Sequence, residues 1–184
     1  MTKKLFFDTD CLSSFLWVER EDIILLNYSG RIVIPQFVYE EFCRPGVQHL
    51  LMTLDNMIRT KTVIKMDIPY GSSDADLFRQ LTKKPVSGMQ TIGKGEASAL
   101  VLAKSHDGIV ASNNLRDVKR YADEFNLQIM TTAEILVEAY GVLYISLPEA
   151  DKIWKDMLLK KRKLPTASFS EYLKNYDRFK VSES

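Results

Sequence analysis

Short apolar runs alternate with amphipathic stretches along most of the chain. Apolar runs with the length of buried strands occupy Leu5–Phe7, Arg31–Pro35, Thr62–Ile68, Gly108–Ser112 and Leu127–Met130. Between and after them, apolar residues recur every three to four positions, as on one side of a helix. This spacing predicts helices at Cys11–Val18, Glu19–Tyr28, Gln36–Phe42, Val47–Thr60, Ser73–Thr82, Glu96–Ala103, Leu115–Phe125, Thr132–Tyr140, Glu149–Leu159 and Ser168–Phe179. Such alternation is typical of an α/β protein with a parallel sheet flanked by helices.

The stretch Gly93–Asp117 is predicted to contain a helix start, a helix, a buried strand and a polar turn. We expect Gly93 and Gly95 to give the backbone freedom just before Glu96. Glu96 then falls in the first helical turn, where the helix dipole favours a carboxylate. Open α/β sheets place their sites at the carboxyl ends of strands. Three side chains with oxygen atoms follow this strand: Asn113, Asn114 and Asp117.

Four acids occupy comparable places along the chain. Asp8 ends the first strand, Glu41 lies on the helix after the second, Glu96 opens the central helix, and Asp117 follows the strand at 108–112. Each alone is best explained as a solvated or capping carboxylate. Brought together they would repel one another, and a hard divalent cation would relieve that repulsion. Such a cluster indicates metal-assisted phosphodiester hydrolysis.

Four motifs in order carry a family resemblance: FFDTD (Phe6–Asp10), VIPQFVYEEF (Val33–Phe42), GKGEASALVLA (Gly93–Ala103) and IVASNNLRDVKRYA (Ile109–Ala122). The chain resembles the PIN-domain ribonucleases, which include the VapC-type toxins of toxin–antitoxin pairs. The resemblance extends to about Tyr144. It implies a three-layer α/β/α sandwich with a central parallel sheet. It also implies an endoribonuclease that requires Mg²⁺ or Mn²⁺ and leaves 5′-phosphate and 3′-hydroxyl ends.

The resemblance also implies which residues form the site. Asp8 matches the first acid of the family, Glu41 the second, Glu96 the third and Asp117 the last. Glu41 fits better than Glu40, which is predicted to turn outward. Many members have an aspartate where this chain has Asn113 or Asn114.

That departure bears on the metal. Asn114 still offers a carbonyl oxygen to an ion or its water, so the expected metal ligands are Asp8, Glu96, Asn114 and Asp117. The missing negative charge weakens the case for a second ion. Asp10 is expected to support the site indirectly, while Thr9 and Ser112 are candidates for orienting the carboxylates.

Charge and composition limit the partners. The formal net charge of +1 does not indicate a protein that coats a polyanion, so contacts with RNA must come from local patches. The candidate substrate-binding residues are Lys94, Arg116 and Lys119, and the basic run Lys160–Lys163 could also contact phosphates. Cys11 and Cys43 are too few for a disulfide framework or a zinc site, and free thiols suit a cytoplasmic protein.

We expect a soluble protein without a membrane span, with residues 1–147 as a PIN-like nuclease domain and residues 148–184 as a C-terminal helical extension packed on it. Its partners would be an RNA substrate, with a small antitoxin and a second copy of the chain as further candidates.

Two alternative functions remain open. Asp8-Thr9-Asp10 has the Asp-x-Asp form of a haloacid-dehalogenase-type phosphatase, although Leu12 stands where that class has threonine. The asparagines allow a non-catalytic binding module on the same fold.

Overall fold

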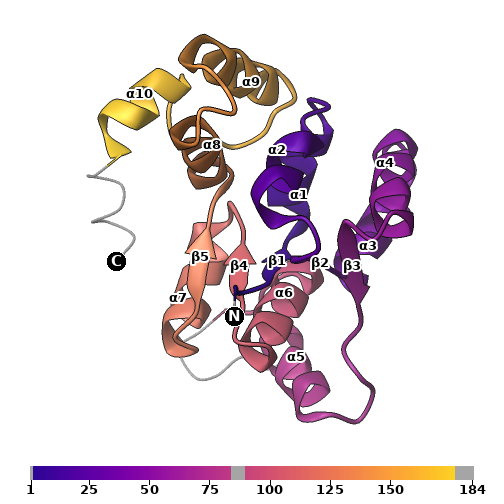
Figure 1. Cartoon of the computed structure of the whole chain (residues 1–184). Helices are drawn as coiled ribbons and strands as arrows, with labels where there is room; N and C mark the ends of the chain where they lie inside the picture. The colour runs from indigo at the N-terminus through magenta and orange to yellow at the C-terminus, as the bar shows by residue number, and fades with distance from the viewer. Residues whose placement is uncertain (1, 84–89, 177–184) are drawn as a thin grey trace.

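A computed structural model of the chain describes residues 2–83 and 90–176. Its centre is a sheet with the strand order β3-β2-β1-β4-β5, in which every neighbouring pair is parallel. The strands are β1 (Leu5–Phe7), β2 (Ile32–Pro35), β3 (Val63–Met66), β4 (Ile109–Ala111) and β5 (Gln128–Met130). Helices cover both faces (Figure 1), which confirms the predicted three-layer α/β/α sandwich.

Strand β1 illustrates why the strands are apolar throughout. Its alternate side chains enter different cores: Leu5 and Phe7 pack on one face of the sheet, and Phe6 packs on the other. A Cβ atom on Gly108, just before β4, would lie 2.7 Å from Cδ2 of Phe6 and 3.0 Å from the carbonyl oxygen of Lys4. Glycine at this position therefore lets the chain pass close to β1 as it enters the sheet.

One face of the sheet carries the larger core. Its helices are α1 (Thr9–Leu16), α2 (Glu21–Tyr28), α3 (Gln36–Phe42), α4 (Gln48–Arg59), α8 (Thr132–Gly141), α9 (Leu147–Leu159) and α10 (Phe169–Lys174). Trp154 of α9 is fully buried and packs its ring beside those of Phe169 and Tyr172. Residues of the C-terminal helices thus belong to the same core as β1 and α1. The domain boundary at residue 147 stays a prediction.

The other face is covered by α5 (Ser73–Lys83), α6 (Lys94–Ser105) and α7 (Leu115–Glu124). Helix α6 lies against the middle of the sheet, where small residues such as Ala97, Ala99 and Ala103 are fully buried. Small side chains allow this helix to approach the strands closely, and that approach places its first turn beside the end of β1.

Several element boundaries differ from the predicted ones. Helix α1 begins at Thr9 rather than Cys11, because Asp8 caps it. Strand β3 ends at Met66, before Asp67 bonds the backbone N–H of Ile68 in the following loop. Helix α10 ends at Lys174, and residues 177–179 of the predicted helix lie outside the described residues. Of the predicted loop Lys83–Thr91, residues 84–89 also lie outside them.

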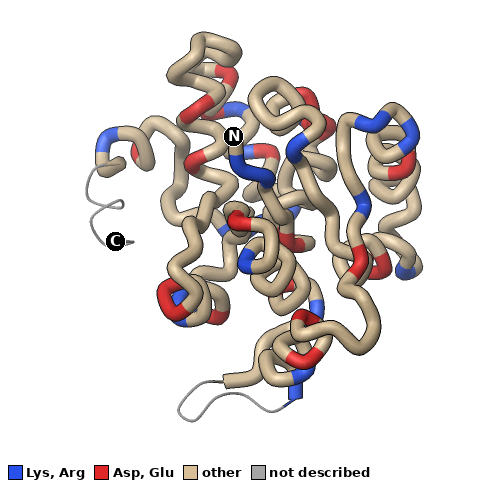
Figure 2. Tube along the Cα trace, turned by 60° about the horizontal axis from the view of Figure 1, so that its bottom comes forward, with Lys and Arg blue, Asp and Glu red and all other residues tan. Residues whose placement is uncertain are grey.

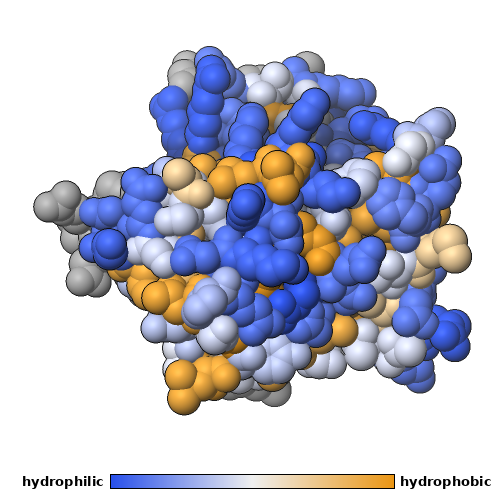
Figure 3. Space-filling model, turned by 90° about the horizontal axis from the view of Figure 1, so that it is seen from above, coloured by the Kyte–Doolittle hydropathy of each residue, from blue (hydrophilic) through white to orange (hydrophobic). Residues whose placement is uncertain are grey.

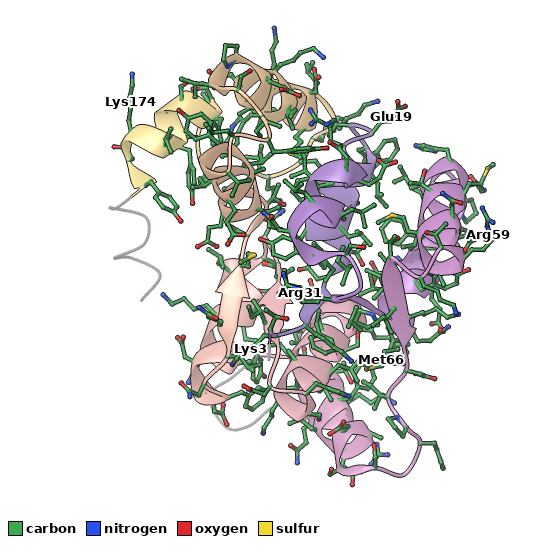
Figure 4. The ribbon with its side chains drawn as sticks, viewed as in Figure 1. Lys3, Glu19, Arg31, Arg59, Met66 and Lys174 are labelled. Carbon is green, nitrogen blue, oxygen red and sulfur yellow. The ribbon has the colours of Figure 1, made fainter. Side chains whose placement is uncertain are left out.

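The amino ends of the parallel strands, here called the amino edge of the sheet, carry different polar groups from the carboxyl ends, here called the carboxyl edge. At the amino edge, Lys3 pairs with Asp107 at 2.7 Å, and Arg31 donates to the carbonyl oxygen of Lys3 at 3.1 Å (Figure 4). The polar groups at the amino edge thus bind one another. The carboxyl edge is where β1 leads into Asp8 and β4 into Ser112, so the candidate site must be sought there.

Acidic and basic residues are interspersed along the backbone trace (Figure 2). Seen from above, apolar areas are broken up by hydrophilic side chains (Figure 3). Within the described parts of the chain, no helix has the length and apolar character required to cross a membrane. Cys11 is buried and Cys43 exposed, both as free thiols.

Candidate active site

Asp8 lies at the centre of the carboxyl edge and is almost completely buried, with 2% of its surface exposed. It directly follows β1 and caps α1, accepting a hydrogen bond of 2.8 Å from the backbone N–H of Cys11. Its other carboxylate oxygen accepts a hydrogen bond from the hydroxyl of Ser112, at the end of β4. Helix α1 and the residue that follows β4 therefore fix the two oxygens of this carboxylate.

Burial raises the pKa of the Asp8 carboxyl from 3.8 to about 7. The hydrogen bonds from Ser112 and Cys11 act in the opposite direction, while the negative charges of Asp10 and Glu96 raise the pKa further. Burial and the neighbouring negative charges therefore destabilise the ionised form of Asp8 in the metal-free protein. A cation in this position would favour the ionised form.

We expect Asp8→Asn to stabilise the metal-free protein, and to do so more at pH 8 than at pH 4. A carboxyl with a raised folded-state pKa gives stability that is present below pH 3.8 and is lost as the pH rises to about 7. Asparagine keeps the cap without the charge, so its advantage should grow across this range by on the order of 2–4 kcal/mol. Urea unfolding with a chelator present, at several pH values, measures this. An advantage that does not change with pH would contradict the prediction.

Asn114 links the remaining acids to Asp8. Its side-chain amide donates to Oε1 of Glu96 at 3.2 Å and to Oδ2 of Asp117 at 2.9 Å. Its backbone N–H donates to the Ser112 hydroxyl at 3.1 Å. The positive end of the amide thus stands between two carboxylates, where it reduces their repulsion as a cation would.

Glu41 approaches the same place from α3. It lines a pocket of about 160 Å³ together with Asp8, Thr9, Asp10, Gly95 and Glu96. Glu40, by contrast, is exposed and accepts a hydrogen bond from Gln36 at 3.0 Å. The orientation predicted for the two acids is therefore the one observed.

Gly95 acts through its small size. Its backbone is not in the left-handed region, and neither is that of Gly93, whose φ is −62°. The expected need for backbone freedom at these glycines was therefore wrong. A Cβ atom on Gly95 would lie 3.2 Å from Oε1 of Glu41 and 3.4 Å from Oγ1 of Thr9. Glycine here lets α3 and α6 approach each other across the pocket, which the sequence did not reveal.

The side chains that line this pocket suit a hard divalent cation. All of its acidic side chains offer oxygen, and Oγ1 of Thr9 is buried beside them without a hydrogen-bond partner among the described residues. Residues 2–83 and 90–176 hold no group of three or more His, Cys, Asp or Glu side chains in a metal-binding arrangement. The acids instead accept hydrogen bonds from neutral side chains: Asp8 from Ser112, and Glu96 and Asp117 from Asn114. An ion would take over the role of these donors.

Asn113 has a different task from Asn114. Its amide group donates to the hydroxyl of Thr132 at 2.8 Å and accepts from the backbone N–H of Thr132 at 2.9 Å. These bonds join the end of β4 to the start of α8. The amide of Asn113 is therefore engaged in structure, and Asn114 alone of the two contacts the acids.

The predicted substrate-binding residues lie on the helices that carry Glu96 and Asp117. Lys94 is exposed at the start of α6, with its ammonium group 5.6 Å from the centre of the Phe37 ring. Arg116 and Lys119 lie on α7, which also carries Asp117; Arg116 is exposed and Lys119 half-buried. Their contact with a substrate remains a prediction.

This is a parallel α/β/α domain of the class that places its sites at the carboxyl ends of the central strands, and the carboxylate oxygens found there suit a hard divalent cation. The comparisons narrow this class to one family. A model of the family DUF3368, described as a PIN domain, matches residues 4–178. The chain therefore belongs to the PIN-domain family.

Two other comparisons complete this result. No curated protein matches the chain significantly. Among solved structures, it is similar to a PilT N-terminus domain protein from the hyperthermophilic archaeon Sulfolobus solfataricus P2. The identity is 14% and the TM-score 0.43, over 73% of this chain and 92% of that one. PIN domains are typically metal-dependent nucleases, which suits the acidic pocket described above.

Proposed function

We propose that this protein is an endoribonuclease that uses Mg²⁺ or Mn²⁺ to hydrolyse RNA phosphodiesters. The observation that carries the proposal is the convergence of Asp8, Glu41 and Glu96 on one pocket at the carboxyl edge of the sheet. Asp117 joins them through Asn114. Membership of the PIN-domain family supports nuclease chemistry at this pocket.

Each residue has a proposed part in the reaction. Asp8, Glu96 and Asp117 would hold the ion together with the side-chain carbonyl oxygen of Asn114, whose amide NH2 group donates to Glu96 and Asp117 in the metal-free protein. Ser112 keeps Asp8 oriented through its hydrogen bond. When bound, the ion lowers the pKa of a coordinated water and offsets charge on the scissile phosphate. Glu41, which lines the same pocket from α3, accepts a hydrogen bond from the attacking water and so orients it. No side chain forms a covalent intermediate.

RNA is the proposed substrate, with Lys94, Arg116 and Lys119 contacting its phosphates. The narrower role of a cytoplasmic toxin, covered by a small antitoxin and acting as a homodimer, is supported only by the resemblance to VapC-type toxins. Expression in a bacterial host tests this role. Growth arrest that a small protein from the adjacent gene relieves would support it, and normal growth would contradict it.

The central test uses purified protein and single-stranded RNA. Incubation with Mg²⁺ or Mn²⁺ should yield internal cleavage, and a chelator should abolish it, because the acids cannot position a water without the ion. Cleavage that persists in chelator would contradict the proposal. Phosphatase activity that survives Glu96→Gln but is lost in Asp8→Asn would also contradict it, because the haloacid-dehalogenase alternative predicts that result.

We expect Glu41→Gln to lower kcat for RNA cleavage by about 10²-fold or more, and the neighbouring Glu40→Gln to change it less than two-fold. Glu41 lines the acidic pocket, whereas the side chain of Glu40 is exposed and accepts a hydrogen bond from Gln36. Both substitutions remove one negative charge from α3. Single-turnover cleavage of a labelled RNA distinguishes them, and equal losses in both variants would assign the effect to charge alone.

A further inference from the structure

The turn after α9 brings a basic segment back toward the candidate active site. Helix α9 ends at Leu159, and Lys161 adopts a left-handed conformation with φ at 60°. The backbone N–H of Arg162 then bonds the carbonyl oxygen of Met157 at 3.0 Å, which closes the turn. The chain that joins α9 to α10 runs back beneath α9, beside α8 and α1 (Figure 1). Lys161, Arg162 and Lys163 lie in this segment, far in sequence from the acids.

Arg162 fixes the segment to α1. Its guanidinium donates to the hydroxyl of Ser13 at 3.1 Å and lies 3.8 Å from Oδ1 of Asp10. Its Nε also donates to the carbonyl oxygen of Lys160 at 3.1 Å. The side chain is only 23% exposed, so these contacts hold the turn in one place rather than extending into solvent. Arg162 is thus a positioning residue for its neighbours.

The result is a pocket of about 240 Å³ that joins the basic segment to the polar ends of β1 and β4. It is lined by Asp10, Ser14, Asn113, Asn114, Lys161, Arg162 and Lys163. Asp10 also lines the acidic pocket, and Asn114 donates to Glu96 within the site. The two pockets are therefore neighbours that share a wall.

The charges of the two pockets are complementary along this wall. The acidic pocket repels a phosphate until a cation is bound, whereas the ammonium groups of Lys161 and Lys163 attract one directly. Both lysines are exposed, and neither forms an ion pair with another described residue. The amides of Asn113 and Asn114 add a polar wall beside them.

We propose that this basic pocket holds the RNA phosphate next to the scissile one, with Lys161 and Lys163 as its anion-binding groups. The proposal rests on the proposed nuclease function, because it takes the acidic pocket as the position of the scissile phosphate. Neighbouring phosphates of one strand would then occupy neighbouring pockets of the protein. The C-terminal segment thereby sets which stretch of RNA lies over the acids.

Lys160 provides a matched control within the same basic run. Its ammonium group lies 5.4 Å from the centre of the Trp17 ring, and Lys160 does not line the basic pocket. Lys155 is exposed on α9. The double variant Lys155→Gln/Lys160→Gln therefore removes the same charge as Lys161→Gln/Lys163→Gln and leaves the pocket intact.

Binding of a fluorescent single-stranded RNA, measured by anisotropy in chelator, tests the pocket without cleavage. We expect Lys161→Gln/Lys163→Gln to weaken binding about ten-fold and to reduce the slope of log Kd against log salt by roughly 0.7, the value for one lost phosphate contact. The Lys155→Gln/Lys160→Gln control should weaken binding less than two-fold. Equal losses in both variants would overturn the proposal, because net charge would then explain the effect. Unchanged RNA affinity in the first variant would also overturn it, and binding of an acidic peptide in its place would identify a protein-binding surface.

Cleavage kinetics separate this proposal from the nuclease function itself. Loss of a contact to a flanking phosphate should raise KM about ten-fold while kcat stays within about two-fold. A wild type that binds RNA through the two lysines but shows no metal-dependent cleavage would contradict the nuclease and support a nucleic-acid pocket. Cleavage by the wild type with the same KM in Lys161→Gln/Lys163→Gln would overturn the pocket and support the nuclease.

Discussion

Replacement of Asp8 by asparagine is expected to abolish metal-dependent RNA cleavage, with a loss in kcat of about 10³-fold or more. Asp8 is the most buried of the acids and stands where β1, α1 and β4 meet. A bound ion stabilises the transition state by several kcal/mol, and each 1.4 kcal/mol corresponds to about ten-fold in rate. Single-turnover cleavage at saturating Mg²⁺ and Mn²⁺ measures the loss.

The same substitution carries its own control for folding. Because Asp8→Asn should raise the stability of the metal-free protein at pH 8, a loss of activity cannot be ascribed to unfolding. Added Mg²⁺ should raise the midpoint of thermal unfolding in the wild type and have a smaller effect in the variant. Near-normal cleavage by a folded Asp8→Asn protein would remove the acidic pocket from the mechanism.

The sheet was the most predictable part of this molecule. Strands such as Leu5–Phe7 are buried on both faces, and that requirement leaves an unbroken apolar run in the sequence. The ends of elements were less predictable because they depend on single side chains with distant partners. Asp8 extends α1 by capping it, and no local pattern separates this role from that of a simple turn residue.

The candidate site was predictable in its acids and less so in its supporting groups. The family motifs place Asp8, Glu41 and Glu96, and the structure brings these residues to one pocket. The distinct tasks of Asn113 and Asn114 follow from the position of α8, which the sequence around β4 does not encode locally. In the sequence, the run Lys160–Lys163 is likewise only a pattern of positive charge. The turn after α9 determines which of its lysines line the basic pocket.

The position of that turn depends on the core beneath it, and Trp154→Ala is expected to be the most destabilising single change in the C-terminal helices. Trp154 is fully buried, and its Nε1 donates to the carbonyl oxygen of Thr166 at 2.9 Å. Its ring centre lies 5.9 Å from that of Phe169 and 5.5 Å from that of Tyr172. Truncation would leave a cavity and an unpaired carbonyl, for a loss of about 3–5 kcal/mol in the free energy of unfolding.

Urea unfolding followed by far-UV circular dichroism measures this loss, with Trp17→Ala as the matched control. Trp17 is only partly buried and packs its ring against His49, so its truncation should cost about 1–2 kcal/mol. Since α9 and α10 share the core of β1 and α1, Trp154→Ala should shift one cooperative transition to lower urea. A separate early transition at unchanged stability of the remainder would instead make the C-terminal helices an independent unit. Unfolding of these helices would then separate the basic pocket from the acids. The contribution of Lys161 and Lys163 to RNA binding would be lost in the same early transition.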